Sequence, residues 1–304
     1  HKGFGQFASE LGAWPNQIQK AWIETLKRGN SLEDEYTLER IKKEKGLAKA
    51  QEFLIKRRER LMKDSVFTAS YLNMEVESVN EMFNSWHTEL GFSTDQMSVI
   101  AKQMISISRS TGLVGANLER ALKSSESVMK SMRGLGLLNS TSAKAVMKMT
   151  ADFQRFGFGE EGQAFLQKLM NGAALNDSRF GSLAAQMAGG DQQLFVDIAS
   201  GRALNKIENR KTMGRNLESA LLSDVGNIMG ADQLANIEAQ LGESLSIANL
   251  QKAIEMSDSD TQLRLNTIIR QKYDNDVMAV AAIVKTFKES GKTYEEQVKD
   301  LENE

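Results

Sequence analysis

Apolar side chains recur every three or four residues through most of this sequence, and that spacing places them on one face of a helix. In the middle of the chain the runs are Val76, Val79, Phe83, Trp86 and Leu90, then Met97, Ile100, Met104 and Ile107, then Leu118, Leu122, Val128 and Met132. Similar runs continue from Leu217 to Phe287. The pattern predicts an all-α fold, an array of short and medium helices.

Glycines divide these runs at nearly regular intervals. Successive members of the set are 20 to 24 residues apart, and the set is Gly91, Gly112, Gly136, Gly157, Gly181 and Gly201. Glycine adopts the positive φ of a helix end without steric cost. Polar residues able to cap the next helix follow two of these glycines, at Ser93 and at Asn139. We therefore expect each glycine to end a helix in a turn that starts the next one.

Charge marks a different kind of segment near the N-terminus. From residue 33 to residue 64 there are ten basic and eight acidic side chains, and leucine recurs every seven residues at Leu47, Leu54 and Leu61. A narrow apolar seam among balanced charges is typical of a long, solvated helix. Acidic residues are in excess from residue 216 onward. We therefore divide the chain into a charged helical segment (1–64), a glycine-punctuated helical array (65–215) and an acidic helical segment (216–304).

Composition supports helices and excludes several chemistries. One proline in 304 residues, with 13 Phe and 15 Met, favours helix over strand. No cysteine is present, so disulfides, thiolate nucleophiles and cysteine zinc sites are excluded. His87 has no second histidine three or four residues away, which argues against a histidine metal site, and we expect it on a helix surface or at an interface. The longest apolar run, from Val277 to Val284, is far shorter than the ~20 residues that cross a bilayer, so we expect no stable membrane insertion.

Basic residues dominate between residues 102 and 148, where only Glu119 and Glu126 oppose them. Such a run has two interpretations: a solvated helix face, or a surface that contacts an anionic partner. Aromatic residues do not interleave with it, as they do where single-stranded nucleic acid stacks. The candidate contact residues are Lys102, Arg109, Arg120, Lys123, Lys130, Arg133, Lys144 and Lys148.

Two motifs suggest ligands, and both lack the context that those ligands need. The stretch RFGFGEEGQAF carries a G-x-G-x-x-G pattern at Gly157, Gly159 and Gly162. A dinucleotide site needs a β-strand before the glycines, whereas residues 143–154 have a helical pattern, and Glu160 with Glu161 would repel phosphate. The acidic pairs within 258–260 and 274–276 lack the glycine and distal glutamate of a calcium loop. We therefore assign no catalytic residue, cofactor or metal, and expect a helix joint in this glycine stretch.

From about residue 67 to residue 217 the sequence resembles the tape measure proteins of tailed bacteriophages. The resemblance lies in short helices whose polar starts follow glycine, as in Leu90-Gly-Phe-Ser-Thr-Asp-Gln-Met97, Ser106-Ile-Ser-Arg-Ser-Thr-Gly112 and Arg133-Gly-Leu-Gly-Leu-Leu-Asn-Ser-Thr-Ser-Ala-Lys144. Members of that family are often much longer and commonly carry a membrane-active or cell-wall hydrolase segment, of which this chain has no clear counterpart.

This resemblance implies a structural virion protein without enzymatic activity or cofactor. Such a protein is mainly helical, lies in several copies inside the tail tube, sets tail length, and contacts tail tube and baseplate proteins. It leaves the tube ahead of the DNA, which passes through the same lumen, so the expected location is the virion tail and then the host cell on infection.

Two other functions fit parts of the sequence. The segment Gly3-Phe-Gly-Gln6-Phe7-Ala8, followed by Glu10, resembles the glycine-x-x-glutamine segment of lytic transglycosylases that cut peptidoglycan, whose catalytic glutamate lies upstream of it. Because His1 stands where an initiator methionine is expected, we expect a piece of a longer protein, and that piece would lack the glutamate. A cellular all-helical scaffold or adaptor is the remaining alternative.

Overall fold

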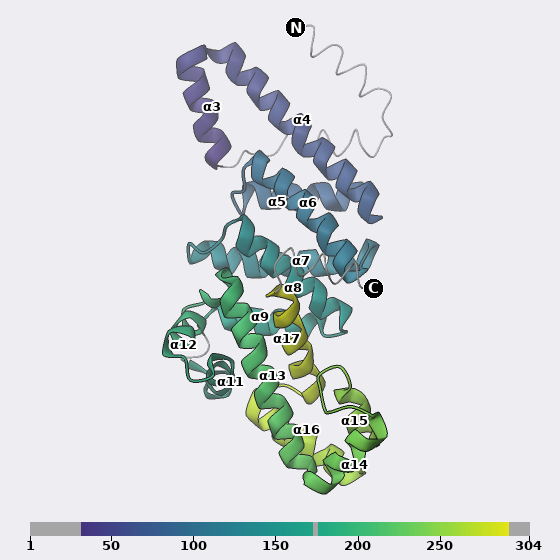
Figure 1. Ribbon diagram of the computed structural model, residues 1–304. Helices are drawn as coiled ribbons and strands as arrows, with labels where there is room; N and C mark the ends of the chain where they lie inside the picture. Colours follow the sequence, from purple (N-terminus) through teal and green to yellow (C-terminus); the bar gives the residue numbers. More distant parts are fainter. Residues whose placement is uncertain (1–31, 173–175, 292–304) are drawn as a thin grey trace. The chain divides into compact units, whose positions relative to one another are not determined.

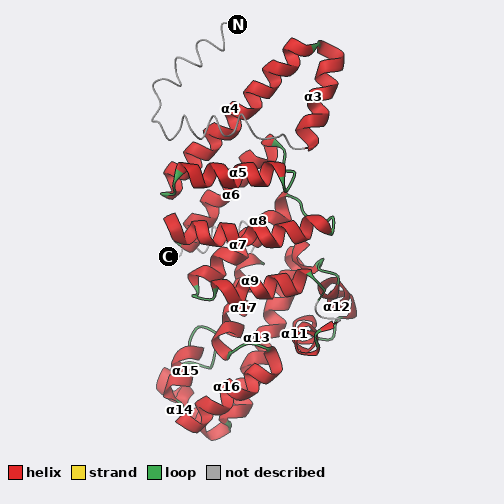
Figure 2. Cartoon of the chain, turned by 180° about the vertical axis from the view of Figure 1, so that it is seen from behind, coloured by secondary structure: helices red, strands yellow, loops and turns green. Residues whose placement is uncertain are grey.

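The computed structural model describes residues 32–172 and 176–291, and it is about 82% helical (Figure 1). Within these residues there are fourteen α-helices, one 3₁₀ turn and no strand (Figure 2). The all-α prediction is therefore confirmed. Contacts divide the chain into two compact units, residues 1–133 and residues 134–304.

The described part of the first unit is built from five helices. They are α3 (Leu32–Lys45), α4 (Leu47–Leu72), α5 (Val76–Thr88), α6 (Thr94–Thr111) and α7 (Gly115–Gly134), the last of which reaches the border between the units. The apolar runs predicted to face inward form the core of this unit, and the largest buried side chains include Trp86, Phe83, Met97, Ile100 and Met104. Flexible methionines fill much of this core, as expected for side chains that adapt to irregular gaps.

The predicted long charged helix near the N-terminus is present as α4, with 26 residues, but Gly46 divides residues 33–64 into a helical hairpin of α3 and α4. Helices α3 and α4 pack side by side and are separated by Gly46, which has φ +85° (Figure 1). A side chain with a Cβ is strained at that φ, so glycine interrupts the helix that the charge pattern suggests. The leucine seam is also only partly buried: Leu61 is 3% exposed but Leu47 is 59% exposed, because most buried positions of α4 lie from Leu61 onward.

Most of the predicted helix stops are confirmed. Positive φ values occur at Gly91, Gly112, Gly136, Gly157 and Gly201. The predicted helix stop at Gly181 is wrong, because this residue lies inside α11 (Ser178–Ala188). Asp177 caps the start of that helix four residues earlier, so the helix continues through Gly181. Positive φ values occur instead at Gly172, just after α9, and at Gly189, just after α11, at +66° and +60°.

Capping boxes start the helices that follow two of these glycines. Ser93 Oγ accepts the Gln96 N–H at 3.4 Å, and the Gln96 side-chain oxygen accepts the Ser93 N–H at 2.8 Å. Asn139 Oδ1 accepts the Ser142 N–H at 2.9 Å, and the Ser142 hydroxyl oxygen accepts the Asn139 N–H at 2.8 Å. These capping-box bonds lie within their own segments, so two helices can separate without losing them.

The described part of the second unit contains nine helices and the 3₁₀ turn. They are α8 (Ser140–Arg155), α9 (Gly159–Met170), α11, α12 (Gln192–Ala199), η1 (Ala203–Asn205), α13 (Ile207–Met229), α14 (Ala231–Leu241), α15 (Leu250–Met256), α16 (Ser259–Tyr273) and α17 (Val277–Ser290).

Phe165 of α9 is the centre of an aromatic cluster in the second unit. Its ring centroid lies 6.3 Å from that of Phe153 on α8 and 5.9 Å from those of Phe180 on α11 and Phe287 on α17. All four rings are buried. Such tilted and edge-on contacts contribute about 0.5–1.5 kcal/mol per pair beyond the burial of area, so this cluster binds four helices into one core.

Helices α13 and α17 approach each other closely at Gly214. A Cβ at this position would lie 3.1 Å from Phe287 Cβ and 3.2 Å from Lys288 N. Near one end of the crossing, the buried Arg210 guanidinium donates to the Ser290 carbonyl oxygen at 3.0 Å. Burial lowers the pKa of Arg210 to about 10, so the side chain stays charged at neutral pH.

The borders drawn from composition do not coincide with the borders of the units. Residue 64 lies within α4 and residue 215 lies within α13, whereas the units meet between Arg133 and Gly134. Charge patterns follow the exposed faces of helices, while a unit border follows packing, so the two need not agree.

Candidate functional site

Six of the eight basic residues proposed as anionic-partner contacts lie on α6 and α7 in the first unit. Two of them are paired with acids: Lys123 Nζ lies 2.6 Å from Glu119, and Lys130 Nζ lies 2.8 Å from Glu126 and 2.7 Å from Glu89. Exposed pairs of this kind contribute at most about 1 kcal/mol. They do reduce the net positive charge that these lysines present to a partner.

The other four differ in their surroundings. Arg109 donates to the Tyr71 hydroxyl at 2.7 Å and lies over that ring, and the Arg133 guanidinium lies 3.4 Å from where a Cβ on Gly91 would stand. Lys102 and Arg120 are exposed, and neither forms an ion pair with a described carboxylate. Contact with an anionic partner stays a prediction, and Lys102 and Arg120 are members of this set that are exposed without an ion pair to a described carboxylate.

Lys144 and Lys148 lie on α8 in the second unit. Lys144 is half-buried, but Lys148 is 8% exposed and its ammonium donates to both carboxylate oxygens of Asp152 at 2.6 and 2.7 Å. Asp152 is fully buried, and burial raises its pKa to about 6 against the lowering effect of the Lys148 charge. Lys148 therefore belongs to the core and does not form part of a contact surface.

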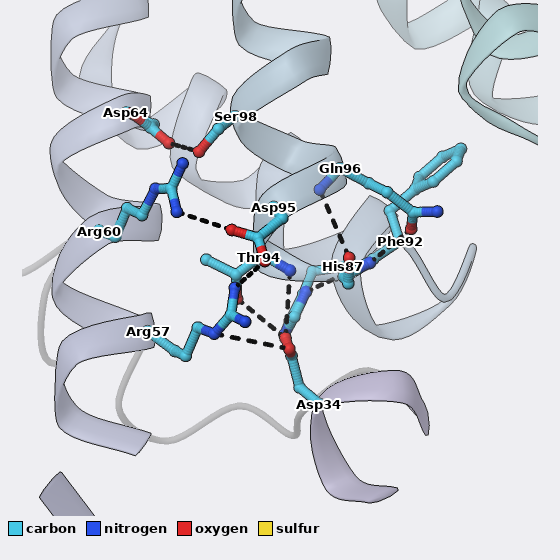
Figure 3. Close-up of polar contacts among 11 residues, drawn as sticks. Asp34, Arg57, Arg60, Asp64, His87, Phe92, Thr94, Asp95, Gln96 and Ser98 are labelled. Carbon is cyan, nitrogen blue, oxygen red and sulfur yellow. Dashed lines mark hydrogen bonds and ion pairs between the residues drawn. The ribbon is translucent and has the colours of Figure 1, made fainter. Parts of the chain in front are cut away.

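A buried carboxylate, Asp34 near the start of α3, organises a polar cluster in the first unit (Figure 3). The Thr94 N–H and hydroxyl both donate to Asp34 Oδ2, at 3.1 and 2.8 Å. Because Thr94 is the first residue of α6, the carboxylate lies at a helix N-terminus, where a negative charge is stabilised. We call Asp34, Arg57, His87, Thr94 and Asp95 the Asp34 cluster.

Arginines of α4 connect the two acids of the Asp34 cluster. Arg57 Nε lies 3.9 Å from Asp34 Oδ1, and another nitrogen of the same guanidinium lies 2.7 Å from Asp95. Arg60 also binds Asp95 at 2.7 Å. The hydrogen bond from Arg57 is the main reason that the pKa of Asp95 lies below its usual range. These bonds join α3, α4 and α6 through residues 23 to 60 positions apart in sequence, which the sequence pattern did not indicate.

His87 is buried, and the prediction of a surface or interface position is wrong. Its Nδ1 lies 2.7 Å from the Phe92 carbonyl oxygen, which can only accept, so Nδ1 carries a proton. Its Nε2 lies 3.6 Å from Asp34 Oδ2. Burial is the largest effect on this ring and lowers the pKa of His87, helped by the charges of Arg58 and Arg57 and opposed by Phe92 and Asp34.

Replacing His87 with glutamine should make the stability of the first unit less dependent on pH between 7.5 and 5. The lowered pKa means that below the ordinary value of 6.5 the unfolded chain binds a proton more readily than the folded one, so stability falls as pH falls. Glutamine cannot titrate, and His1 is present in both proteins. Urea unfolding at several pH values measures the slope; equal slopes for the two proteins would contradict this assignment.

The Asp34 cluster resembles a hydrolytic site in its residue types but is suited to holding helices together. A nucleophile and its base must be reached by a substrate, yet Thr94 is 1% exposed and Asp34 is 5% exposed. The bonds of Asp34 run instead to the backbone and side chain that start α6. We interpret the cluster as a structural connection between α3 and the α5–α6 turn.

The second unit contains an open cavity between the α8–α9 turn, α15, α16 and α17, which we call the α17 hollow. Its volume is about 510 Å³, within the usual range for a small-molecule site. Apolar residues supply most of the wall, among them Phe156 and Phe158 from the turn and Ala281 from α17. The polar residues at the wall are Gln251, Glu255, Asn266 and Lys285.

The glycine stretch is a helix joint, as predicted. Helix α8 precedes it where a dinucleotide site would need a strand, and Glu160 and Glu161 lie in the first turn of α9. The third glycine has a packing role that the sequence did not reveal: a Cβ on Gly162 would lie 2.1 Å from Phe153 Cγ. Contact with a buried ring accounts for this glycine without a ligand.

The acidic pairs near residues 258 and 274 lie at helix ends, where Asp258, Asp274 and Asp276 are caps and Asp260 lies in the first turn of α16. Asp258 accepts the Thr261 N–H at 2.9 Å at the start of α16, and Asp276 accepts the Ala279 N–H at 2.8 Å at the start of α17. Asp274 ends α16 at φ +56°. Within residues 32–172 and 176–291, no three acidic or histidine side chains form a group that could hold a metal ion.

Two further expectations concern membranes and peptidoglycan. None of the helices that the structure describes combines the length and the hydropathy needed to cross a membrane. The segment from Gly3 to Glu10, which carries the likeness to lytic transglycosylases, lies outside the described residues.

Comparison of the chain with protein-family models, with curated proteins and with solved structures finds no match in any of the three.

Proposed function

We propose that this chain is a structural segment of a phage tail tape measure protein, present in several copies in the tail lumen, where it contacts tube or baseplate subunits. Its role is to set tail length and to leave the tube during genome ejection, and not to catalyse a reaction. The observation that carries the proposal is the repeated joint at Gly91 and Gly136, in which a glycine at positive φ is followed by a capping box at Ser93 and Asn139.

The construction of these joints suits a chain that must unpack and pass through a narrow tube. The capping-box bonds lie within their own segments and persist when neighbouring helices part, whereas the Thr94 N–H at the start of α6 loses its bond to Asp34. The contacts that are lost are largely those of methionine, leucine and valine side chains, with Met97, Met104, Met129 and Met132 among the buried ones. Unpacking then exposes apolar surface but leaves the helices intact.

A change in chain length tests the ruler function in the phage that carries the gene. Deleting residues 113–136, one interval from glycine to glycine, should shorten the tail by about 36 Å if each helical residue spans about 1.5 Å. Electron microscopy of purified tails measures the length, and mass spectrometry shows whether the chain is present.

A matched control keeps the length of the chain and alters only its packing: Met129→Leu with Met132→Leu should leave tail length unchanged. Tails of normal length that contain the shortened chain would contradict the ruler function. Absence of peptides of this chain from purified wild-type virions would contradict any virion role.

A further inference from the structure

The α17 hollow is lined by buried apolar residues and by apolar side chains that remain partly exposed. Val277, Ala281 and Ala282 of α17 are at most 3% exposed and form the base. Phe156 and Phe158 of the α8–α9 turn also line the hollow, and each is only half-buried. Apolar side chains that remain partly exposed around a concave space are characteristic of ligand sites.

The α8–α9 turn holds these two phenylalanines in position. Gly157, at φ +81°, separates them, and the Phe158 N–H donates to the Phe153 carbonyl oxygen at 2.9 Å. The turn is therefore fixed to the end of α8 by backbone bonds, and its aromatic side chains line the hollow. Preorganised walls of this kind reduce the entropy lost when a ligand binds.

A cation lies at the wall of the hollow, and no carboxylate in the described part of the chain pairs with it. Lys285 Nζ lies 5.5 Å from the centre of the Phe156 ring, and it forms no ion pair with a carboxylate of the described residues. The acid that also lines the hollow, Glu255, accepts a hydrogen bond from Gln251 at 3.0 Å and is not within ion-pair distance of Lys285. The hollow thus combines an apolar floor with an available ammonium group.

From this combination we propose that the α17 hollow binds a single-chain apolar carboxylate, with the hydrocarbon on the floor formed by α17 and the carboxylate on Lys285. The side-chain amide of Asn266, which also lines the hollow, can donate to the second oxygen. A volume of about 510 Å³ accepts a chain of roughly ten carbons. This site is independent of the proposed role in tail assembly.

Decanoate is the probe for this site, titrated calorimetrically into the full chain. We expect saturable binding of one decanoate per chain and weaker binding of decyltrimethylammonium, which has the same hydrocarbon and the opposite charge. Lys285→Glu should weaken decanoate binding at least about tenfold, because it replaces an attraction by a repulsion. Lys252→Glu, at an exposed lysine of α15 outside the hollow, makes the same charge change and should leave binding unchanged.

A variant that fills the hollow tests whether decanoate binds there or on apolar surface elsewhere on the chain. Met278→Trp, at a half-buried position lining the hollow, should abolish binding while circular dichroism shows the same helix content. The proposal is overturned if the folded wild-type chain shows no saturable binding, if the ammonium compound binds as tightly as decanoate, or if Lys285→Glu and Lys252→Glu weaken binding equally.

Discussion

Replacing Lys148 with methionine should lower the free energy of unfolding of the second unit by about 3–5 kcal/mol at pH 8. The substitution leaves the carboxylate of Asp152 fully buried without the ammonium that now donates to both its oxygens. An isolated buried charge is among the most costly groups in a protein core. Urea unfolding followed by circular dichroism measures the loss, and hydrogen exchange of α8 peptides assigns it to this unit.

The loss of unfolding free energy caused by Lys148→Met should be smaller at pH 5 than at pH 8. Burial already raises the pKa of Asp152 to about 6, from an ordinary value of 3.8, and removing Lys148 removes the charge that opposes this rise. The folded state then binds a proton more tightly than the unfolded state, so its stability falls as pH rises above the unfolded pKa. At pH 5 the acid is neutral in the folded variant and the cost of its burial is smaller.

Two controls isolate the ion pair. Lys144→Met makes the same change one turn earlier on α8, at a half-buried lysine that forms no ion pair with a described residue, and should cost less than about 1 kcal/mol. Adding Asp152→Leu to Lys148→Met removes the stranded carboxylate and should restore most of the stability. A loss of equal size for both lysines, or a loss that does not vary with pH, would refute the role given to Asp152.

Gly162→Ala should destabilise the second unit by about 2–3 kcal/mol, although alanine favours helices by about 1 kcal/mol over glycine. The added methyl group would lie 2.1 Å from Phe153 Cγ and 2.6 Å from its Cβ. Phe153 is buried in the aromatic cluster around Phe165, so its ring cannot move without displacing its neighbours. Thermal unfolding of the variant compared with the wild type measures the effect.

Gly159→Ala provides the matched comparison on the same helix. A Cβ there would approach Gln154 Oε1 at 2.3 Å, but this atom is the far end of a flexible side chain that can rotate away. We expect this variant to be as stable as the wild type or more stable by up to about 1 kcal/mol, from helix propensity alone. If both variants lose the same stability, close packing on Phe153 is not the reason for Gly162.

Local features of this fold could be predicted because their causes lie within a few residues of sequence. The capping boxes at Ser93 and Asn139 follow from polar side chains just past a glycine, and the buried methionines follow from helical spacing. Errors arose where two local signals compete. At Gly46 the charge pattern continues but the backbone turns, and at Gly181 a cap at Asp177 overrides the glycine.

The candidate sites could not be predicted, because they join residues that are distant in sequence. Asp34 meets Thr94 across 60 positions, and the buried His87 lies 3.6 Å from the carboxylate that α3 supplies. The α17 hollow combines the turn after α8 with α15, α16 and α17. A single sequence carries no signal for such pairings, and the spacing of Lys148 and Asp152 is the same as that of an exposed helical pair.

The aromatic cluster around Phe165 has a consequence for the order in which the second unit folds. Phe165 and Phe180 are synthesised long before Phe287, which lies 122 residues after Phe165 in the sequence. Contacts over such a separation form late and slowly, because the loop between them must be closed first. While α17 is still being made on the ribosome, α9 and α11 present a hydrophobic face that a chaperone can bind.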